Sequence, residues 1–138
     1  MDIASKELPD IPGYKNVLEA RAGDEGTSIL QLDFALVKSF FEKLNAHFPA
    51  GITVFDDNII FAQNLFRVAG SSRYHPNSGI SSLGHAIPAA IGAQFSETST
   101  TFALIGDGGF QMCCMELMTA VNYNIPLNVV MFNNSTMG

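Results

Sequence analysis

The chain has 138 residues, which suits a single domain that buries its core without disulfides or a structural metal. Hydrophobic residues make up 47% of it, which excludes a disordered chain, and the net charge of −6 argues against binding to a nucleic-acid backbone. Charged residues make up only 14%, and no Lys or Arg follows Arg73. We therefore expect partner chains or a partner domain to cover the second half. The alternative is a monomer with a surface rich in Ser, Thr and Asn.

The sequence shows neither an export signal nor a membrane span, which is typical of a cytoplasmic protein that does not bind membranes. The N-terminus lacks the basic start and apolar run of an export signal, and no segment approaches the roughly 20 apolar residues of a membrane span. Cys113 and Cys114 are adjacent, and neighbouring cysteines rarely form a disulfide because the geometry is strained. Together with Met112, Met115 and Met118, they are interpreted as core and interface residues rather than a metal site.

Residues 1–30 contain Pro and Gly without a sustained hydrophobic period, so they are interpreted as a lead-in segment or linker before a domain at 31–138. Apolar periodicity and turn residues predict the remaining elements. In chain order these are a helix over 34–48 with Asp33 as its N-cap, a strand over 52–55, a short helix over 60–67, a loop over 69–82, a helix over 83–95, a strand over 101–105, a tight turn over 106–109, a helix over 110–124 and a strand over 127–132.

The alternation of strands and helices predicts an α/β fold, an open parallel sheet with helices on both faces. Ligands of such sheets bind outside the carboxyl ends of the strands. Three polar segments follow the predicted strands, at 56–58, 106–109 and 133–136, and they are the candidate site. Asp56 and Asp57, in the first of them, are also interpreted as caps of the short helix that follows.

Segment 106–109, Gly-Asp-Gly-Gly, joins a strand to a helix, and its glycines would let a phosphate approach the backbone N–H groups. It matches neither the dinucleotide fingerprint nor a Walker loop. Asp107 would repel a bare phosphate, so a hard cation such as Mg²⁺ is expected between them. Asn134, after the next strand, can add a neutral side-chain oxygen. The backbone carbonyl of Thr136 is a natural further ligand.

These residues resemble a known family. Gly106-Asp107-Gly108, followed after 24 residues by Asn133-Asn134, is similar to the thiamine-diphosphate-binding motif. Residues 78–94 are similar to the cofactor-binding segment of acetolactate synthase, benzoylformate decarboxylase and pyruvate oxidase, and residues 116–120 also fit that group. The likeness covers roughly residues 33–138. It implies the C-terminal, diphosphate-binding domain of these enzymes, here incomplete at its C-terminus.

The resemblance also implies roles for individual residues. Asp107 and Asn134 match the side-chain ligands of Mg²⁺, and Thr136 matches the carbonyl ligand. Leu83 matches the bulky residue that bends the cofactor, and Ser81, usually Gly in relatives, matches the residue whose carbonyl receives the pyrimidine amino group. Many relatives have Ser where this chain has Gly109. The implied cofactor-binding residues are Asn58, Ser81, Ser82, Leu83, Gly106, Gly108, Gly109, Phe110, Asn134 and Thr136.

The family's activating glutamate comes from a separate pyrimidine-binding domain, and no residue of this chain matches it. The resemblance therefore implies half a site, inactive alone and without a catalytic residue of its own, in a homo- or hetero-oligomeric lyase or transferase. The implied reaction is decarboxylation of a 2-oxo acid. One alternative is a truncated, non-catalytic homologue that acts as a cofactor-binding or interaction module. Another is a nucleotide- or phosphosugar-binding domain, against which the missing G-x-G-x-x-G and late basic residues argue.

Overall fold

The computed structural model describes residues 34–96 and 98–134, which belong to one compact unit beginning at Phe34. The lead-in segment 1–30 and Thr136 lie outside the described residues, so the predictions made for them stay predictions. Asp33, the predicted N-cap of the first helix, also lies outside them. The elements in chain order are α2 (Ala35–His47), β1 (Thr53–Asp56), α3 (Ile60–Leu65), β2 (Arg73–Pro76), α4 (Ala86–Gln94), β3 (Thr101–Gly106), α5 (Asp107–Cys113), the 3-10 helix η2 (Cys114–Glu116), α6 (Leu117–Asn122) and β4 (Asn128–Phe132).

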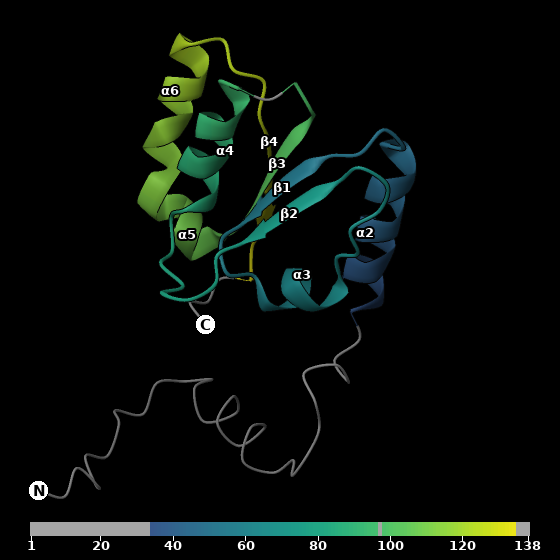
Figure 1. Cartoon of the computed structure of the whole chain (residues 1–138). Helices are drawn as coiled ribbons and strands as arrows, with labels where there is room; N and C mark the ends of the chain where they lie inside the picture. The colour runs from purple at the N-terminus through teal and green to yellow at the C-terminus, as the bar shows by residue number, and fades with distance from the viewer. Residues whose placement is uncertain (1–33, 97, 135–138) are drawn as a thin grey trace, which may run out of the picture. The chain divides into compact units, whose positions relative to one another are not determined.

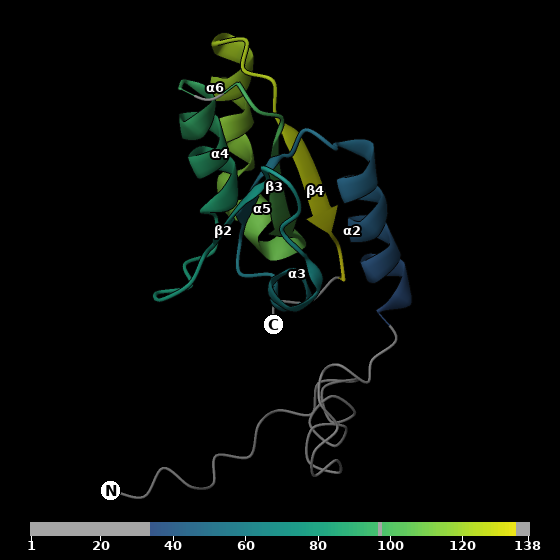
Figure 2. The ribbon, with the colours of Figure 1, turned by 45° about the vertical axis from the view of Figure 1, so that its right-hand side comes forward.

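The predicted α/β fold is confirmed. The described strands form one parallel sheet in the order β2-β1-β3-β4. Figures 1 and 2 show α4, α5 and α6 on one face of this sheet, and α2 and α3 on the other. Every helix in the described part of the chain is too short or too polar to span a bilayer.

Strand β3 is buried on both faces, as expected for the centre of such a sheet. Phe102 and Leu104 point into a core shared with α2 and α3. Ala103 and Ile105 point into a second core shared with α4, α5 and α6. Because side chains alternate along a strand, this one segment holds the two helix layers in place.

The first core is largely aromatic. Phe41 of α2 is 2% exposed, and its ring packs against those of Phe66 and Phe132 at centroid separations of 5.5 and 6.3 Å. Phe48, just past the helix, packs edge-on against Phe102 of β3. The periodic apolar residues that predicted the first helix therefore form the face that α2 buries.

Strand β2 was not predicted, because its sequence, Arg-Tyr-His-Pro, lies inside the polar segment interpreted as a loop over 69–82. It is a largely exposed edge strand that pairs with β1, with Arg73 beside Thr53 and Pro76 beside Asp56. Proline is tolerated at a sheet edge because its missing N–H removes no central hydrogen bond. An exposed edge strand buries little apolar surface, so it has no hydrophobic pattern to detect.

Other boundaries also differ from the prediction. No separate turn follows β3, because α5 begins at Asp107 directly after the strand ends at Gly106. The single helix predicted over 110–124 is divided into α5, η2 and α6. Helix α2 begins at Ala35, so its N-cap position falls on Phe34, which makes no side-chain capping bond.

Asp56 links three elements at the end of β1. Its buried carboxylate accepts hydrogen bonds from the backbone N–H of Ile59 at 2.8 Å, from Nε2 of Gln63 at 3.0 Å and from the Tyr74 hydroxyl at 2.9 Å. Asp56 is not the N-cap of α3, because that position falls on Ile59, which has no side-chain capping bond. By accepting the N–H of Ile59, Asp56 instead tethers the start of α3, and it also holds β2. Burial raises the pKa of Asp56 despite these three bonds, and the neighbouring Asp57 adds to the rise.

The raised pKa predicts how stability depends on pH. A carboxyl whose folded pKa exceeds its unfolded value stabilises the fold when protonated, and this contribution is lost as pH rises through the folded pKa. Between about pH 7 and pH 4, acidification should therefore stabilise the wild type relative to Asp56→Asn. Thermal melts of both proteins across this range would show it. The opposite slope would mean that the hydrogen bonds outweigh burial.

Candidate functional site

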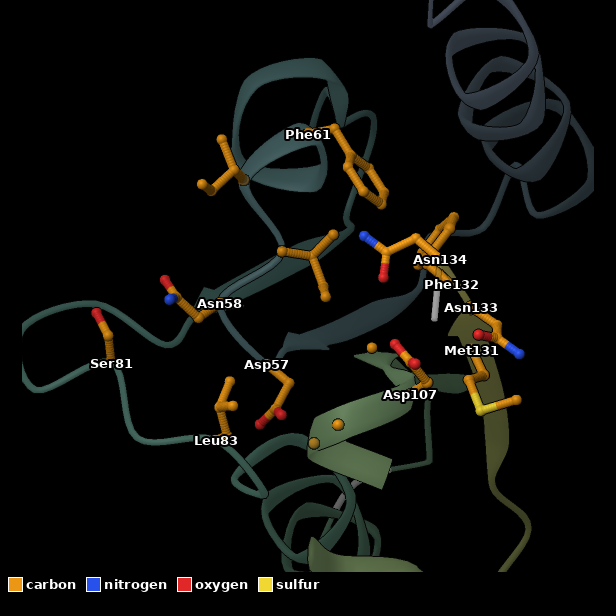
Figure 3. A pocket seen from close by; sticks show the side chains of 15 residues that line it. Asp57, Asn58, Phe61, Ser81, Leu83, Asp107, Met131, Phe132, Asn133 and Asn134 are labelled. Atoms are coloured by element: carbon orange, nitrogen blue, oxygen red, sulfur yellow. The ribbon is translucent and has the colours of Figure 1, made fainter. Parts of the chain in front are cut away.

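A cavity of about 800 Å³ opens at the carboxyl ends of β1, β3 and β4, where the candidate site was predicted. That size suits a small-molecule ligand or cofactor. Figure 3 shows side chains from all three strand ends and from the loop before α4 around it. Its lining residues are Asp57, Asn58, Ile59, Ile60, Phe61, Ser81, Leu83, Gly106, Asp107, Gly108, Gly109, Met131, Phe132, Asn133 and Asn134.

The order of the strands explains why the cavity forms there. From β1 the chain passes to β2 on one side, and then returns past β1 to pair β3 on its other side. The connections leaving β1 and β3 therefore diverge and leave a crevice between them, which is where open parallel sheets bind ligands. Asp57 and Asn58 lie on one side of the crevice, and Gly106 and Asp107 on the other.

Asp107 and Asn134 come together at the ends of two adjacent strands. Gly106 of β3 pairs with Phe132 of β4, so the residues that follow both strands emerge at the same edge. Figure 3 shows the Asp107 carboxylate and the Asn134 amide both pointing into the cavity. Two oxygen-bearing side chains, one charged and one neutral, thus face the same space, as the sequence predicted.

The loop before α4 forms another wall and has an unusual backbone. Ser81 has φ of +54° and Gly84 has φ of +84°, both in the left-handed region. Ser81 thus adopts a conformation that glycine favours, at a position where the resemblance implied glycine. Leu83 lies between them and lines the cavity half-buried.

Asp57 is the principal site residue that the sequence analysis misassigned. It was interpreted as a cap of the short helix α3, whereas its carboxylate accepts the backbone N–H groups of Gly84, His85 and Ala86 at the start of α4. The side chain is fully buried. Asp57 also contributes to raising the pKa of the Cys113 thiol, although burial of that thiol is the larger cause. The residues contacted are 27 to 29 positions away in the chain, so no local pattern signals this contact.

Comparison with known proteins identifies the domain. The family model described as "Thiamine pyrophosphate enzyme, C-terminal TPP binding domain" matches residues 57–138. The chain belongs to this family of thiamine pyrophosphate (TPP, thiamine diphosphate) enzymes. The matched region begins at Asp57 and contains every described residue that lines the cavity.

Individual relatives agree with this assignment. The chain is 34% identical over 82 residues to a "probable acetolactate synthase large subunit" of Methanococcus aeolicus, covering 59% of this chain and 14% of the relative. It is 30% identical over 128 residues to a 3D-(3,5/4)-trihydroxycyclohexane-1,2-dione hydrolase of Lacticaseibacillus casei, covering 91% and 20%. A thiamine diphosphate-dependent 4-hydroxybenzoylformate decarboxylase of Rhodococcus jostii RHA1 superposes with a TM-score of 0.64 at 26% identity, covering 73% and 20%. The chain thus spans a fifth or less of each of these relatives.

Among the predicted cofactor contacts that the structure describes, all but Ser82 and Phe110 line the cavity of the TPP-binding domain. Phe110 packs against the second core. Ser82 is exposed, and its carbonyl accepts a hydrogen bond from Asn77. The sequence analysis missed an apolar part of the lining, which includes Ile59, Phe61 and Met131. The available signal was their position, between β1 and the first turn of α3 and near the carboxyl end of β4.

The methionines of α5, η2 and α6 correct another interpretation. Met112, Met115 and Met118 are 65%, 76% and 55% exposed, so they do not belong to the core of this chain. Cys113, interpreted in the same way, is buried. The interpretation of the methionines as interface residues stays a prediction.

The loop conformation can be tested at Gly84. An alanine there would have to adopt φ of +84°, and its Cβ would lie 3.4 Å from Cβ of Met112, so Gly84→Ala should lower the free energy of unfolding by about 1–2 kcal/mol. Gly92 of α4 is the matched control, because a Cβ there meets nothing within 4 Å and alanine favours helix by about 0.5–1 kcal/mol. Urea unfolding would compare them, and equal effects would contradict the strained turn.

Proposed function

We propose that this domain anchors the diphosphate of thiamine diphosphate through Mg²⁺, held by Asp107, Asn134 and the carbonyl of Thr136. The observation that carries the proposal is the convergence of the Asp107 carboxylate and the Asn134 amide in one cavity of a TPP-binding domain. Thr136 lies outside the described residues and enters on the family resemblance. The same convergence favours an anchoring role over the alternative of a nucleotide-binding domain.

The residues that line the cavity fit a diphosphate bound through Mg²⁺. Carboxylate and amide oxygens are hard ligands of the kind that Mg²⁺ prefers, and Mg²⁺ is commonly held by few protein groups together with phosphates. None of the described residues that line the cavity is Lys, Arg or His. A diphosphate entering between Asp57 and Asp107 therefore needs a cation to offset the negative charge.

When bound, thiamine diphosphate supplies a carbon nucleophile and an electron sink for breaking a bond next to a carbonyl group. The residues of this chain would position it. The backbone N–H groups of Gly108 and Gly109, in the first turn of α5, would be donors to the diphosphate. Leu83 would support the bend of the cofactor from the facing wall, and the carbonyl of Ser81 would accept the pyrimidine amino group. Asn58, after β1, lines the cavity on the side opposite Asp107 and would be a further contact of the cofactor.

For the whole enzyme we propose decarboxylation of a 2-oxo acid, in line with the decarboxylase and acetolactate synthase relatives. A second candidate is cleavage of a cyclic 1,2-dione, because the relative with that substrate in its name aligns with 91% of this chain. Both substrate classes carry adjacent carbonyl groups. Either reaction would use the same anchoring residues, since substrate specificity would reside mainly outside this domain.

A separate pyrimidine-binding domain or subunit would complete the site and supply the activating glutamate. An exposed apolar surface supports this proposal. It consists of Met112, Met115, Met118, Val121 and Tyr123, which are each more than half exposed. Large apolar residues gathered on α5, η2 and α6 are typical of a surface that another chain or domain covers.

Metal-dependent binding of the cofactor would test the anchoring role. Calorimetric titration of the chain with thiamine diphosphate should show binding with Mg²⁺ that EDTA abolishes. Asp107→Ala should weaken binding at least tenfold, equivalent to about 1.4 kcal/mol, because it removes the charged metal ligand. Asn134→Ala should weaken it less, because a neutral ligand is lost.

Glu116→Gln is the matched control, since it removes one carboxylate charge from η2 outside the cavity and should leave binding unchanged. Binding that survives EDTA, or Asp107→Ala, would contradict a Mg²⁺ bridge. An absence of binding to the wild-type chain would show that it does not hold the cofactor by itself, and would favour the non-catalytic alternative.

A further inference from the structure

The Asp57 carboxylate organises a segment distant in sequence. Oδ2 accepts the N–H of Gly84 at 2.9 Å, and Oδ1 accepts those of His85 at 2.6 Å and Ala86 at 3.1 Å. Its own backbone N–H donates to the carbonyl of Leu104 at 2.9 Å, which fixes it to the sheet. Hydrogen bonds to a carboxylate are stronger than those between neutral groups, and a negative charge is favoured at the N-terminus of a helix such as α4.

Gly109 of α5 lies against the same carboxylate. A Cβ at this position would be 2.1 Å from Oδ2 of Asp57, far inside van der Waals contact, and 3.3 Å from its Cγ, slightly inside it. It would also lie 3.1 Å from Cγ1 of Ile105, so the site offers it little other space. The carboxylate cannot withdraw without giving up three hydrogen bonds. Residue 109 is therefore restricted to glycine while Asp57 is present.

The loop that Asp57 holds, residues 77–85, contains no helix or strand. Three of its residues, Gly79, Ser81 and Gly84, have positive φ. Leu83 immediately precedes the first N–H that Asp57 accepts. Figure 3 shows the Asp57 side chain lying between Leu83 and the start of the helix that carries Asp107. A displacement of the carboxylate would thus be passed to both sides of the cavity.

We propose that Asp57 is a positioning residue of the cofactor pocket. Its carboxylate fixes the start of α4, and with it Leu83, and its bulk dictates glycine at position 109. The link between residues 57 and 109 stands on geometry alone. Its consequence for the cofactor rests on the proposed function.

Amide hydrogen exchange of the wild-type chain and its variants, followed by NMR, tests the first part without cofactor. In Asp57→Ser, the amides of Gly84, His85 and Ala86 should exchange at least about tenfold faster. In Asp57→Asn, Oδ1 can still accept two of them, so only the Gly84 amide should lose protection.

Asp56→Asn is the matched control, because it alters the adjacent buried carboxylate, which binds Ile59 instead. It should leave the exchange of the Gly84, His85 and Ala86 amides unchanged. Unchanged exchange of these amides in Asp57→Ser, or an equal change in Asp56→Asn, would overturn the proposal.

A double-mutant cycle tests the link to Gly109. Gly109→Ala alone should lower Tm by at least about 5 °C, whereas Gly92→Ala should not lower it. In the background of Asp57→Ser, the same Gly109→Ala change should lower Tm by less than half as much, since the overlapping carboxylate is gone. Additive shifts would overturn the link. If Asp57→Ser does not fold, Gly109→Ala alone still tests the link between residues 57 and 109. It should displace the Asp57 carboxylate and so alter the amide resonances of Gly84–Ala86, and unaltered resonances would overturn the link.

Cofactor titration of the same variants tests the consequence. Asp57→Asn should raise the Kd for thiamine diphosphate with Mg²⁺ at least about threefold, and Glu116→Gln, outside the cavity, should leave it unchanged. Altered amides with an unchanged Kd would overturn the positioning role. If the wild type does not bind, the anchoring function fails, while the exchange and melting results still decide whether Asp57 orders the loop.

Discussion

The parallel pairing of β1 with β3 is the constraint on which the pocket depends. These strands lie side by side in the sheet although two connections and β2 separate them in the chain. Their central position is stable because β3 sends alternate side chains into two cores, one with α2 and α3 and one with α4, α5 and α6. Once the pairing forms, the segments after both strands must face each other across the crevice, and the chemistry of the site follows from which residues occupy those positions.

Two adjacent carboxylates at the end of β1 then divide the task of fixing that crevice. Successive side chains at the end of a strand point to opposite faces. Asp56 thus binds the α3 and β2 side, through Ile59 and Tyr74, while Asp57 binds the start of α4. Burying either carboxylate without its hydrogen-bond donors would cost about 3–5 kcal/mol of free energy, the order of magnitude for an unpaired buried charge. Both are therefore committed to structure, which leaves Asp107 as the acidic lining residue available to a metal.

The sequence predicted the fold where a pattern is local. The apolar runs of β1, β3 and β4 and the spacing in α2 are such patterns, and so is the placement of Asp107 and Asn134 at strand ends. It failed where structure depends on distant contacts. Strand β2 is an edge strand with a polar sequence, and its pairing is set by β1 rather than by its own residues. The partners of Asp57 lie nearly 30 positions further along the chain, so a local interpretation assigned the side chain to the nearest helix instead.

The scarcity of positive charge means that an anionic cofactor bound in this site would need a cation. No Lys or Arg follows Arg73, and the described lining of the cavity holds two carboxylates and no basic side chain. A diphosphate bound there would gain only dipoles from the protein, such as the N–H groups of Gly108 and Gly109, and would meet the charge of Asp107 at close range. In a partly buried site that repulsion is poorly screened. A divalent ion between the Asp107 carboxylate and the diphosphate would attract both groups and so offset their mutual repulsion. An acidic domain can for this reason hold an anionic cofactor, provided that the metal binds with it.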